Sequence, residues 1–282
     1  MPITPQELIS NLGDLPSLPQ VAAQVLRLAA DPDSTIDDLQ KVVATDQALA
    51  AQILKIANSP MFGMMREVRT LTQAIMTLGF STIRSIVIAS SARNLYRKAG
   101  TGLQERLLWE HALVTALASR SYARCLRSNR VEEAFLGGLL HDIGRTVMGL
   151  KFPERYGALV RSIYNQETDG VDAELEGFGF DHAMVGEALL HSWNLARSLE
   201  LVVRWHHHPA QAPAEEQALA AFVALGNQLA LERGVGLGRP ESLQGATQEA
   251  VQLLALAPEA LAQHHQTVVE ALDAENNLIR DF

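Results

Sequence analysis

The succession of short apolar segments with helical periodicity, each ended by Pro, Gly, Asn or Asp, constrains the fold of this chain more than any other feature. Residues 31–33 (Asp-Pro-Asp) and 58–60 (Asn-Ser-Pro) are two such stops, and Ser34 or Thr35 and then Asp46 can cap the helices that follow. Runs rich in Val, Thr and Tyr are hard to find, and aromatic residues make up only 5% of the sequence, whereas the helix formers Ala and Leu are abundant. The sequence therefore predicts an all-α fold in which helices pack on helices.

The apolar periodicity also places the individual helices. The expected helical segments are 20–29, 36–44, 47–57, 70–78, 81–96, 105–126, 131–150, 154–165, 182–191, 196–205, 214–233, 244–256 and 259–279. The clearest breaks are residues 98–102 and the glycine-rich residues 234–240, the latter interpreted as flexible and not as a nucleotide loop, because no strand precedes it. These breaks divide the chain into an N-terminal helical subdomain (1–104), a second helical subdomain (105–233) and a C-terminal helical tail (234–282).

The charge of the chain argues against nucleic acid as a partner. The formal net charge is −9, and the acidic excess lies in residues 105–282, which hold 24 acidic against 14 basic residues. Binding to a phosphate backbone relies on clustered Lys and Arg, and the second helix of a would-be helix-turn-helix at 36–58 offers only Lys55. The one local cluster is interpreted as a solvated helix face rather than a phosphate-binding surface. It comprises Arg120, Arg124 and Arg127, with Arg130 after them.

The sequence is also typical of a soluble protein of the cytoplasm. Cys125 is the only cysteine, so no intramolecular disulfide can form, a reducing compartment is expected, and the thiol is interpreted as a packing group. Residues 1–20 lack the basic start and apolar run of a signal peptide, and no stretch approaches the ~18 apolar residues of a membrane span. We therefore expect a cytoplasmic protein without a membrane partner.

Histidines and one aspartate form the pattern that carries chemistry. His141 and Asp142 directly follow the apolar run 135–140, and burying an imidazole beside a carboxylate costs several kcal/mol unless a metal, a proton or hydrogen bonds compensate. Neutral imidazoles with a carboxylate suit Fe, Mn, Zn or Ni, and helices that converge in a bundle can direct them to one point. The other histidines in this pattern are His111, His182, His206 and His207.

Residues 133–145, centred on Leu-Leu-His-Asp-Ile-Gly, resemble the HD motif of metal-dependent phosphohydrolases. The order of the histidines is similar to the ligand order of two-metal members of that superfamily, including the HD-GYP cyclic-di-GMP phosphodiesterases. A narrower resemblance, over residues 8–230, is to the HDOD family. It rests on the signposts 15–19 (LPSLP), 45–49 (TDQAL), 55–59 (KIANS), 77–79 (TLG), 189–195 (LLHSWNL) and 206–209 (HHHP).

The resemblance implies a helical bundle of HD/HDOD type with one or two divalent transition metal ions. It makes Asp142 the carboxylate that bridges them and implies a water activated between two metals. The ligand set that it implies is His111, His141, Asp142, His182, His206 and His207.

Two departures from the superfamily pattern bear on activity. The superfamily usually ends its ligand set with an Asp on a later helix, where this chain has Asn227, a neutral and poorer ligand. HD-GYP proteins carry a lysine after the HD motif and a Gly-Tyr-Pro signature, where this chain has Arg145 and no such signature. Hydrolysis of cyclic-di-GMP therefore has little support, and Arg145 either binds a phosphate or pairs with a neighbouring acid.

Three readings of the function remain open. In the leading one the chain is a regulatory module of bacterial signal transduction, as HDOD proteins are thought to be, with signalling proteins as partners and a retained HD site. The second is a metal-dependent phosphohydrolase of a nucleotide or another phosphoester, in which Asp142 and Arg145 are the candidate catalytic and phosphate-contacting residues. The third is a nucleotide-sensing module that binds without turnover.

The remaining histidines are expected to lie outside the site. His191 and His208 are interpreted as outside the ligand set, the latter facing solvent before Pro209, and His264 and His265 as surface residues of the tail. Asp181 is expected to orient His182.

Overall fold

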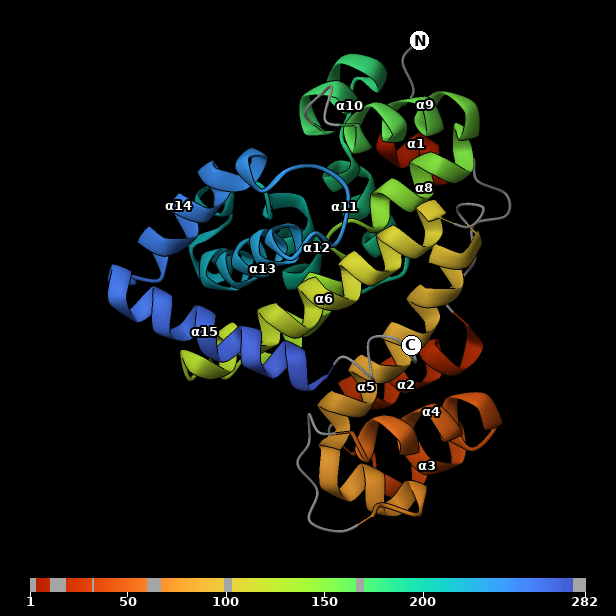
Figure 1. Cartoon of the computed structure of the whole chain (residues 1–282). Coiled ribbons are helices and arrows are strands. Elements are labelled where there is room, and N and C mark those ends of the chain that lie inside the picture. The colour runs from red at the N-terminus through yellow and green to blue at the C-terminus, as the bar shows by residue number, and fades with distance from the viewer. Residues whose placement is uncertain are drawn as a thin grey trace. The chain divides into compact units, whose positions relative to one another are not determined.

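The computed structural model describes residues 4–10, 19–31, 33–59, 67–98, 103–165 and 170–275, and their regular secondary structure is entirely helical (Figure 1). The predicted all-α fold is confirmed. By their contacts the residues divide into two compact units, one of Pro16–Asn94 with Glu270–Phe282 and the other of Met1–Leu15 with Leu95–Val269. Residues 234–269, set apart as a tail from the sequence, pack within the second and larger unit. The three-part division at 104 and 233 stays a prediction.

The smaller unit is built from helices whose ends follow the predicted stops within a few residues. They are α2 (Gln20–Ala30), α3 (Ile36–Val43), α4 (Gln47–Ala57) and most of α5 (Leu71–Lys98). Thr35 caps α3 in a reciprocal capping box with Asp38, and the Asp46 carboxylate caps α4 by accepting from the Leu49 amide. The two helices predicted on either side of Gly79 form one element with a kink at that glycine, whose φ is 77°.

The larger unit contains the remaining helices. They are α1 (Pro5–Ser10), α6 (Leu103–Cys125), α7 (Val131–Leu140), α8 (Ile143–Lys151), α9 (Pro153–Tyr164), α10 (Gly170–Phe178), α11 (His182–Ser192), α12 (Arg197–Trp205), α13 (Ala214–Glu232), α14 (Gln244–Leu253) and α15 (Pro258–Ala274), with short 3₁₀ turns η2 (Pro209–Gln211) and η3 (Pro240–Leu243). Helices α1 and α10 were not predicted. The helix predicted over 131–150 is two helices, broken at His141 and Asp142.

The core of the larger unit surrounds the break between α7 and α8. Helices α6, α7 and α13 pack on one another, and α11 packs on both α8 and α12. The closest approach is at Gly144, where a side-chain carbon would lie 1.9 Å from the backbone oxygen of His182. Only a glycine lets α8 come this near to α11, and the contact brings His182 next to Asp142.

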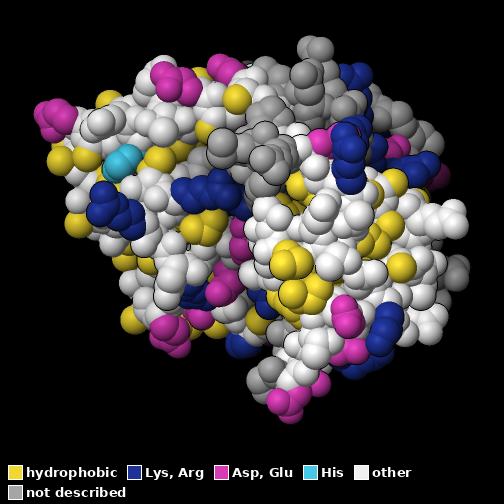
Figure 2. Space-filling model, turned by 90° about the horizontal axis from the view of Figure 1, so that it is seen from below, with side chains coloured by type: hydrophobic (Ala, Val, Ile, Leu, Met, Phe, Trp, Pro, Cys, Tyr) yellow, Lys and Arg dark blue, Asp and Glu magenta, His cyan; other side chains and the backbone are white. Residues whose placement is uncertain are grey.

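Arg120 departs from the expected solvated stripe. Its side chain is buried at 4% exposure, and its Nη2 lies 2.5 Å from Glu132 Oε1, whereas Arg124 and Arg127 are exposed. The expectation of a fully solvated face was wrong because α7 starts with acidic residues that pack against α6. On the face drawn in Figure 2, Lys and Arg side chains lie in several groups beside acidic and apolar ones.

Helix α5 corrects one expectation about membranes. Its segment Leu71–Arg97 has the length and apolar composition of a membrane span, although no such stretch was expected from the sequence. Of the apolar stretch of 18 residues within this segment, 56% is buried. Core helices of globular proteins have the same length and composition, so one such helix is weak evidence for a span.

Replacing Gly144 by alanine should destabilise the protein by about 3 kcal/mol or more, because the added methyl group overlaps the α11 backbone. Gly177→Ala is the matched control, since the Cβ position of this helical glycine meets nothing within 4 Å and alanine favours helix by up to ~1 kcal/mol. Urea unfolding followed by circular dichroism measures both variants. Equal midpoints for the two variants would contradict the close packing of α8 on α11.

Candidate metal centre

The break between α7 and α8 presents a histidine and an aspartate to the interior. His141 follows the last turn of α7 and Asp142 precedes the first turn of α8, with exposures of 0% and 6%. The His141 Nδ1 atom donates to the Gly138 carbonyl at 2.7 Å, which directs the opposite side of its ring away from α7. The apolar run before His141 therefore buries the pair and positions it.

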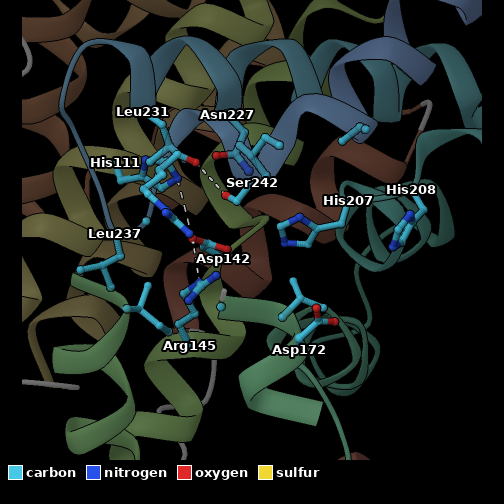
Figure 3. Close-up of a pocket in the computed structure, with 18 of the residues that line it drawn as sticks. His111, Asp142, Arg145, Asp172, His207, His208, Asn227, Leu231, Leu237 and Ser242 are labelled. Atoms are coloured by element: carbon cyan, nitrogen blue, oxygen red, sulfur yellow. Dashed lines mark hydrogen bonds and ion pairs between the residues drawn. The ribbon is translucent and has the colours of Figure 1, made fainter. Parts of the chain in front are cut away.

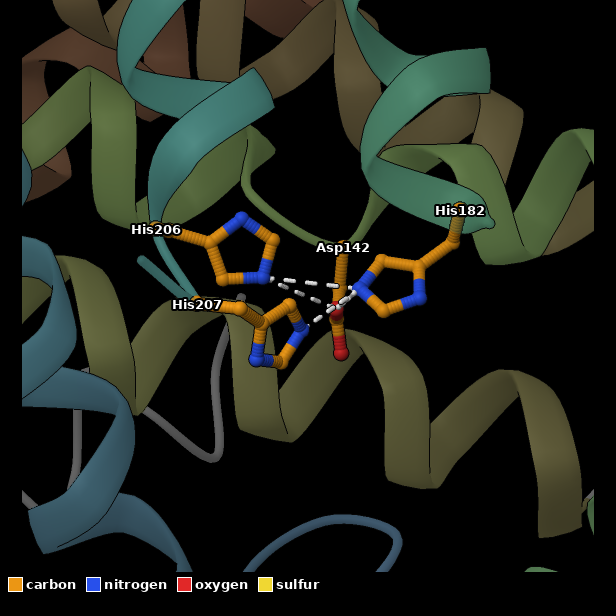
Figure 4. A group of neighbouring side chains, drawn as sticks. All are labelled: Asp142, His182, His206 and His207. Atoms are coloured by element: carbon orange, nitrogen blue, oxygen red, sulfur yellow. Dashed lines mark hydrogen bonds and ion pairs between the residues drawn. The ribbon is translucent and has the colours of Figure 1, made fainter. Parts of the chain in front are cut away.

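Four more histidines from three other helices converge on Asp142. His111 lies in the middle of α6, His182 is the first residue of α11, and His206 and His207 directly follow α12. Figure 4 shows His182 on one side of Asp142 and the rings of His206 and His207 on the other. The structure thus brings all six predicted ligand side chains together.

The two oxygens of Asp142 face different sets of imidazoles. Oδ1 lies 3.0 Å from His182 Nε2 and 3.9 Å from His206 Nε2. Oδ2 lies 3.7 Å from the Nε2 atoms of both His111 and His141. The donors accordingly form two groups that share Asp142, one with His182, His206 and His207 and the other with His111 and His141.

Hydrogen bonds at the outer nitrogen fix the orientation of four rings. In each ring Nδ1 donates to an oxygen outside the cluster, so a neutral imidazole carries its proton there and its Nε2 lone pair points inward. The four bonds are His111 to the Val235 carbonyl at 3.0 Å, His141 to the Gly138 carbonyl at 2.7 Å, His206 to the Val203 carbonyl at 2.8 Å and His182 to Glu174 Oε2 at 2.6 Å.

The inner nitrogens lie at spacings that suit metal ligands. His111 Nε2 and His141 Nε2 are 3.2 Å apart, and His182 Nε2 lies 3.4 Å from His206 Nε2 and 3.0 Å from His207 Nε2. Two nitrogens about 2.1 Å from one ion lie about 3.0 Å apart at octahedral angles and about 3.4 Å at tetrahedral angles. Without a cation, two neutral rings such as His111 and His141 would hold lone pairs against each other. The donor set therefore fits a divalent transition metal.

The environment keeps most of these imidazoles neutral. Burial holds the pKa of His141 and His207 well below the usual value, lowers that of His111, and lowers that of His206 to about 4. His182 differs, because the nearby carboxylates of Glu174 and Asp142 overcome burial and the repulsion of Arg145, and they raise its pKa to about 9. Metal binding must therefore displace a proton at His182.

Glu174 is a functional residue that the sequence did not reveal. It is fully buried, and its Oε2 accepts from both the Nδ1 and the backbone amide of His182, while Oε1 accepts from the Tyr156 hydroxyl. It therefore takes the orienting role expected of Asp181, which instead caps α11 through the Met184 amide. The expectation for Asp181 was wrong, and Glu174 was missed because α10 was not predicted.

Arg145 joins the two buried carboxylates. Its Nε lies 3.0 Å from Asp142 Oδ2 and its Nη1 lies 3.3 Å from Glu174 Oε1, with only 6% of the residue exposed. Of the two alternatives left by the sequence, pairing with neighbouring acids is the one that the geometry shows. The charges of Asp142 and Arg145 stabilise each other. The pKa of the Asp142 carboxyl therefore lies well below its usual range despite burial.

A cavity of about 300 Å³ reaches the cluster. Figure 3 shows Asp142 between His111 and His207 at its inner end, with Arg145 and Asn227 beside them. Asn227 is buried on α13 and lines the cavity together with His111, so the position expected of a last ligand lies at the site. The outer wall comes partly from residues that follow α13, among them Leu237, Arg239 and Ser242.

The other histidines lie away from the cluster. His191 is exposed and pairs with Glu200, and His208 is exposed at the edge of the cavity. His265 is not a plain surface residue, because its Nδ1 lies 3.0 Å from the Tyr122 hydroxyl and joins α15 to α6.

Removing the charge of Glu174 should weaken metal binding while leaving every predicted ligand in place. We expect Glu174→Gln to bind Zn²⁺ 10- to 100-fold more weakly in calorimetric titrations, because a neutral amide oxygen accepts from His182 Nδ1 more weakly than a carboxylate and leaves the imidazole a poorer ligand. Glu176→Gln, an exposed carboxylate on the same helix, is the control and should bind as the parent does. Equal affinities for the two variants would rule out this role for Glu174.

Comparisons with known proteins agree with the fold. A curated relative from Treponema pallidum (strain Nichols), itself uncharacterized, is 26% identical over 223 residues, which are 78% of this chain and 43% of the relative. The chain therefore spans less than half the length of that relative. Among solved structures, an HDOD domain protein of unknown function from Geobacter sulfurreducens has a TM-score of 0.74 at 23% identity, covering 95% of this chain and 96% of its own.

Two further structures have TM-scores of 0.74 at 25% identity. One is a candidate phosphohydrolase from Shewanella amazonensis SB2B, with 93% of each chain covered. The other is a candidate signal transduction protein from Marinobacter aquaeolei VT8, with 94% of this chain and 59% of that one covered. Residues 15–209, more than half of the chain, match the family model of the HDOD domain. This protein belongs to the HDOD family.

Proposed function

We propose that this protein is a regulatory HDOD module of bacterial signal transduction that binds a divalent transition metal at the cluster around Asp142. The observation that carries the proposal is the orientation of four imidazoles by outward Nδ1 hydrogen bonds, which directs their Nε2 atoms to one buried carboxylate. A site built in this way matches metal chemistry better than a polar core, since facing lone pairs are unfavourable without a cation. The ligands in this proposal are the six predicted residues.

The charge of the site favours one tightly bound ion over two. At the site, the two buried carboxylates of Asp142 and Glu174 exceed the guanidinium of Arg145, which pairs with both, by one negative charge. One divalent ion leaves one excess positive charge, and a second ion leaves three, so the second ion binds more weakly unless an anion accompanies it. The tighter ion belongs to His182, His206 and His207 with Asp142, because that group holds three imidazoles and Oδ1 is free of Arg145.

The same features support regulation over hydrolysis. Arg145 is paired with Asp142 and Glu174, so a phosphate in the cavity would have to compete with these carboxylates for its guanidinium, and Asn227 supplies no charge for a second ion. A bound ion would act as a Lewis acid toward a phosphoryl oxygen that entered the cavity. The cavity supports binding of a nucleotide or another phosphoester, with occupancy relayed to signalling proteins in the cytoplasm.

Hydrolysis is the second candidate function, favoured by the cavity that opens onto Asp142 and His207. Turnover of bis(p-nitrophenyl) phosphate or a cyclic dinucleotide by the metal-loaded parent, lost in Asp142→Ala, would establish it. We expect no turnover above the background of Asp142→Ala.

The metal itself is tested by elemental analysis of the purified, tag-free protein. We expect close to one equivalent of Fe, Mn, Zn or Ni in the parent, and loss of the metal in His206→Ala and Asp142→Ala with the helical circular dichroism retained. His191→Ala, which removes an exposed imidazole outside the cluster, should keep the metal. A parent that takes up none of these ions after reconstitution would refute the metal site.

Adding a carboxylate at the second group should raise its affinity for metal. In Asn227→Asp we expect a second equivalent to bind at least tenfold more tightly than in the parent, because the new charge lies beside His111 and offsets the excess positive charge. Stepwise Zn²⁺ titration resolves the two equivalents. An unchanged second step would show that charge does not limit occupancy of the His111–His141 group.

A further inference from the structure

The segment after α13 is shaped by glycines and by a helix-ending motif. Helix α13 ends in a Schellman motif, in which the amide of Gly234 donates to the Leu231 carbonyl and the amide of Val235 donates to the Ala230 carbonyl, both at 2.9 Å. Gly234, Gly236 and Gly238 have φ values of 72°, 122° and 99°, in the region that favours glycine. Residues 234–238 are called the glycine strap below. The motif fixes the direction in which the Val235 carbonyl points.

The glycine strap covers a predicted metal ligand. The Val235 carbonyl accepts the hydrogen bond from His111 Nδ1, and His111 is only 3% exposed. At Gly236 an added side-chain carbon would lie 2.4 Å from His111 Nδ1 and 2.9 Å from its Cγ. The strap backbone therefore rests directly on the imidazole, and a residue other than glycine would have to push the ring or the strap away. The predicted break is present, since α13 ends at Glu232 and η3 begins at Pro240, and its backbone also contacts His111.

The strap also leads into the outer wall of the cavity. Leu237 and Gly238 line the cavity together with Ser242 and Gly245, which belong to η3 and the first turn of α14 (Figure 3). A displacement of the strap therefore moves both His111, a predicted metal ligand, and the cavity wall that a bound molecule would contact.

We propose that the glycine strap is the positioning element of His111, and that metal occupancy of the His111–His141–Asp142 group is coupled through it to the conformation of residues 234–246. The coupling rests on the proposed metal binding, whereas the positioning of His111 does not. The strap lies beyond residues 15–209, the range that matches the family model, so this role follows from the contacts of this chain. Coupling of this kind is reciprocal, and a contact that seats the strap strengthens metal binding while bound metal holds the strap in place.

The test compares Gly236→Ala with Gly238→Ala in the full chain. Both changes put alanine at a positive φ and so carry similar backbone strain, but a methyl group at Gly238 meets nothing within 4 Å. Hydrogen exchange of peptides covering 234–246 is measured in metal-free protein and after addition of Zn²⁺, with a peptide of α7 as the reference for global stability. Zn²⁺ affinity is measured by calorimetry on the same proteins.

In metal-free protein we expect exchange over 234–246 to be at least fivefold faster in Gly236→Ala than in Gly238→Ala, with the reference peptide unchanged. Zn²⁺ should slow this exchange in the parent and in Gly238→Ala, and the weaker Zn²⁺ step should be at least tenfold weaker in Gly236→Ala. Equal exchange in the two metal-free variants would overturn the strap as the positioning element, whether or not the parent binds metal. Zn²⁺ binding in the parent without any change in exchange over 234–246 would overturn the coupling, while leaving the proposed metal site intact.

Discussion

The buried carboxylate of Asp142 is the constraint on which the larger unit depends. An ionised carboxylate in a protein interior is tolerated only where positive charge and hydrogen-bond donors surround it. In this protein Arg145 comes from the following turn of α8, His182 comes from α11, and the other imidazoles come from α6 and from the ends of α7 and α12. Each of these helices must hold its register for the charge to be compensated, so the site specifies how the helices pack.

A second layer of polar contacts carries that constraint outward. Glu174 joins α10 to α11 and, through Tyr156, to α9, so the short helices above the cluster are tied to it by one carboxylate. The Val235 carbonyl ties the segment after α13 to the cluster in the same way, through its hydrogen bond from His111. Three of the four oriented rings donate to a backbone carbonyl, and His182 donates to Glu174. Each of these four imidazoles therefore keeps its other nitrogen for the cluster.

The sequence predicted the parts of this arrangement that depend on local pattern. The helix ends at Thr35, Asp46 and Gly79 follow from capping and glycine chemistry, and the convergence of six side chains follows from the HD resemblance. It did not predict Glu174 or the covering of His111, because both arise from contacts between segments far apart in the chain. Nor did it reveal the break at Asp142, since an apolar run continues on both sides and nothing in the periodicity marks a helix end.

The cavity wall has a consequence for how proteins of this kind diverge. The metal-facing side chains up to His207 lie within the range that matches the family, whereas Leu237, Arg239 and Ser242 lie after it. The donors and this part of the cavity wall are thus encoded in different stretches of sequence. Substitutions at Arg239 or Ser242, beyond the glycine strap, can change the cavity wall without changing a donor, so two relatives with identical donors can differ in the molecule that fits the cavity.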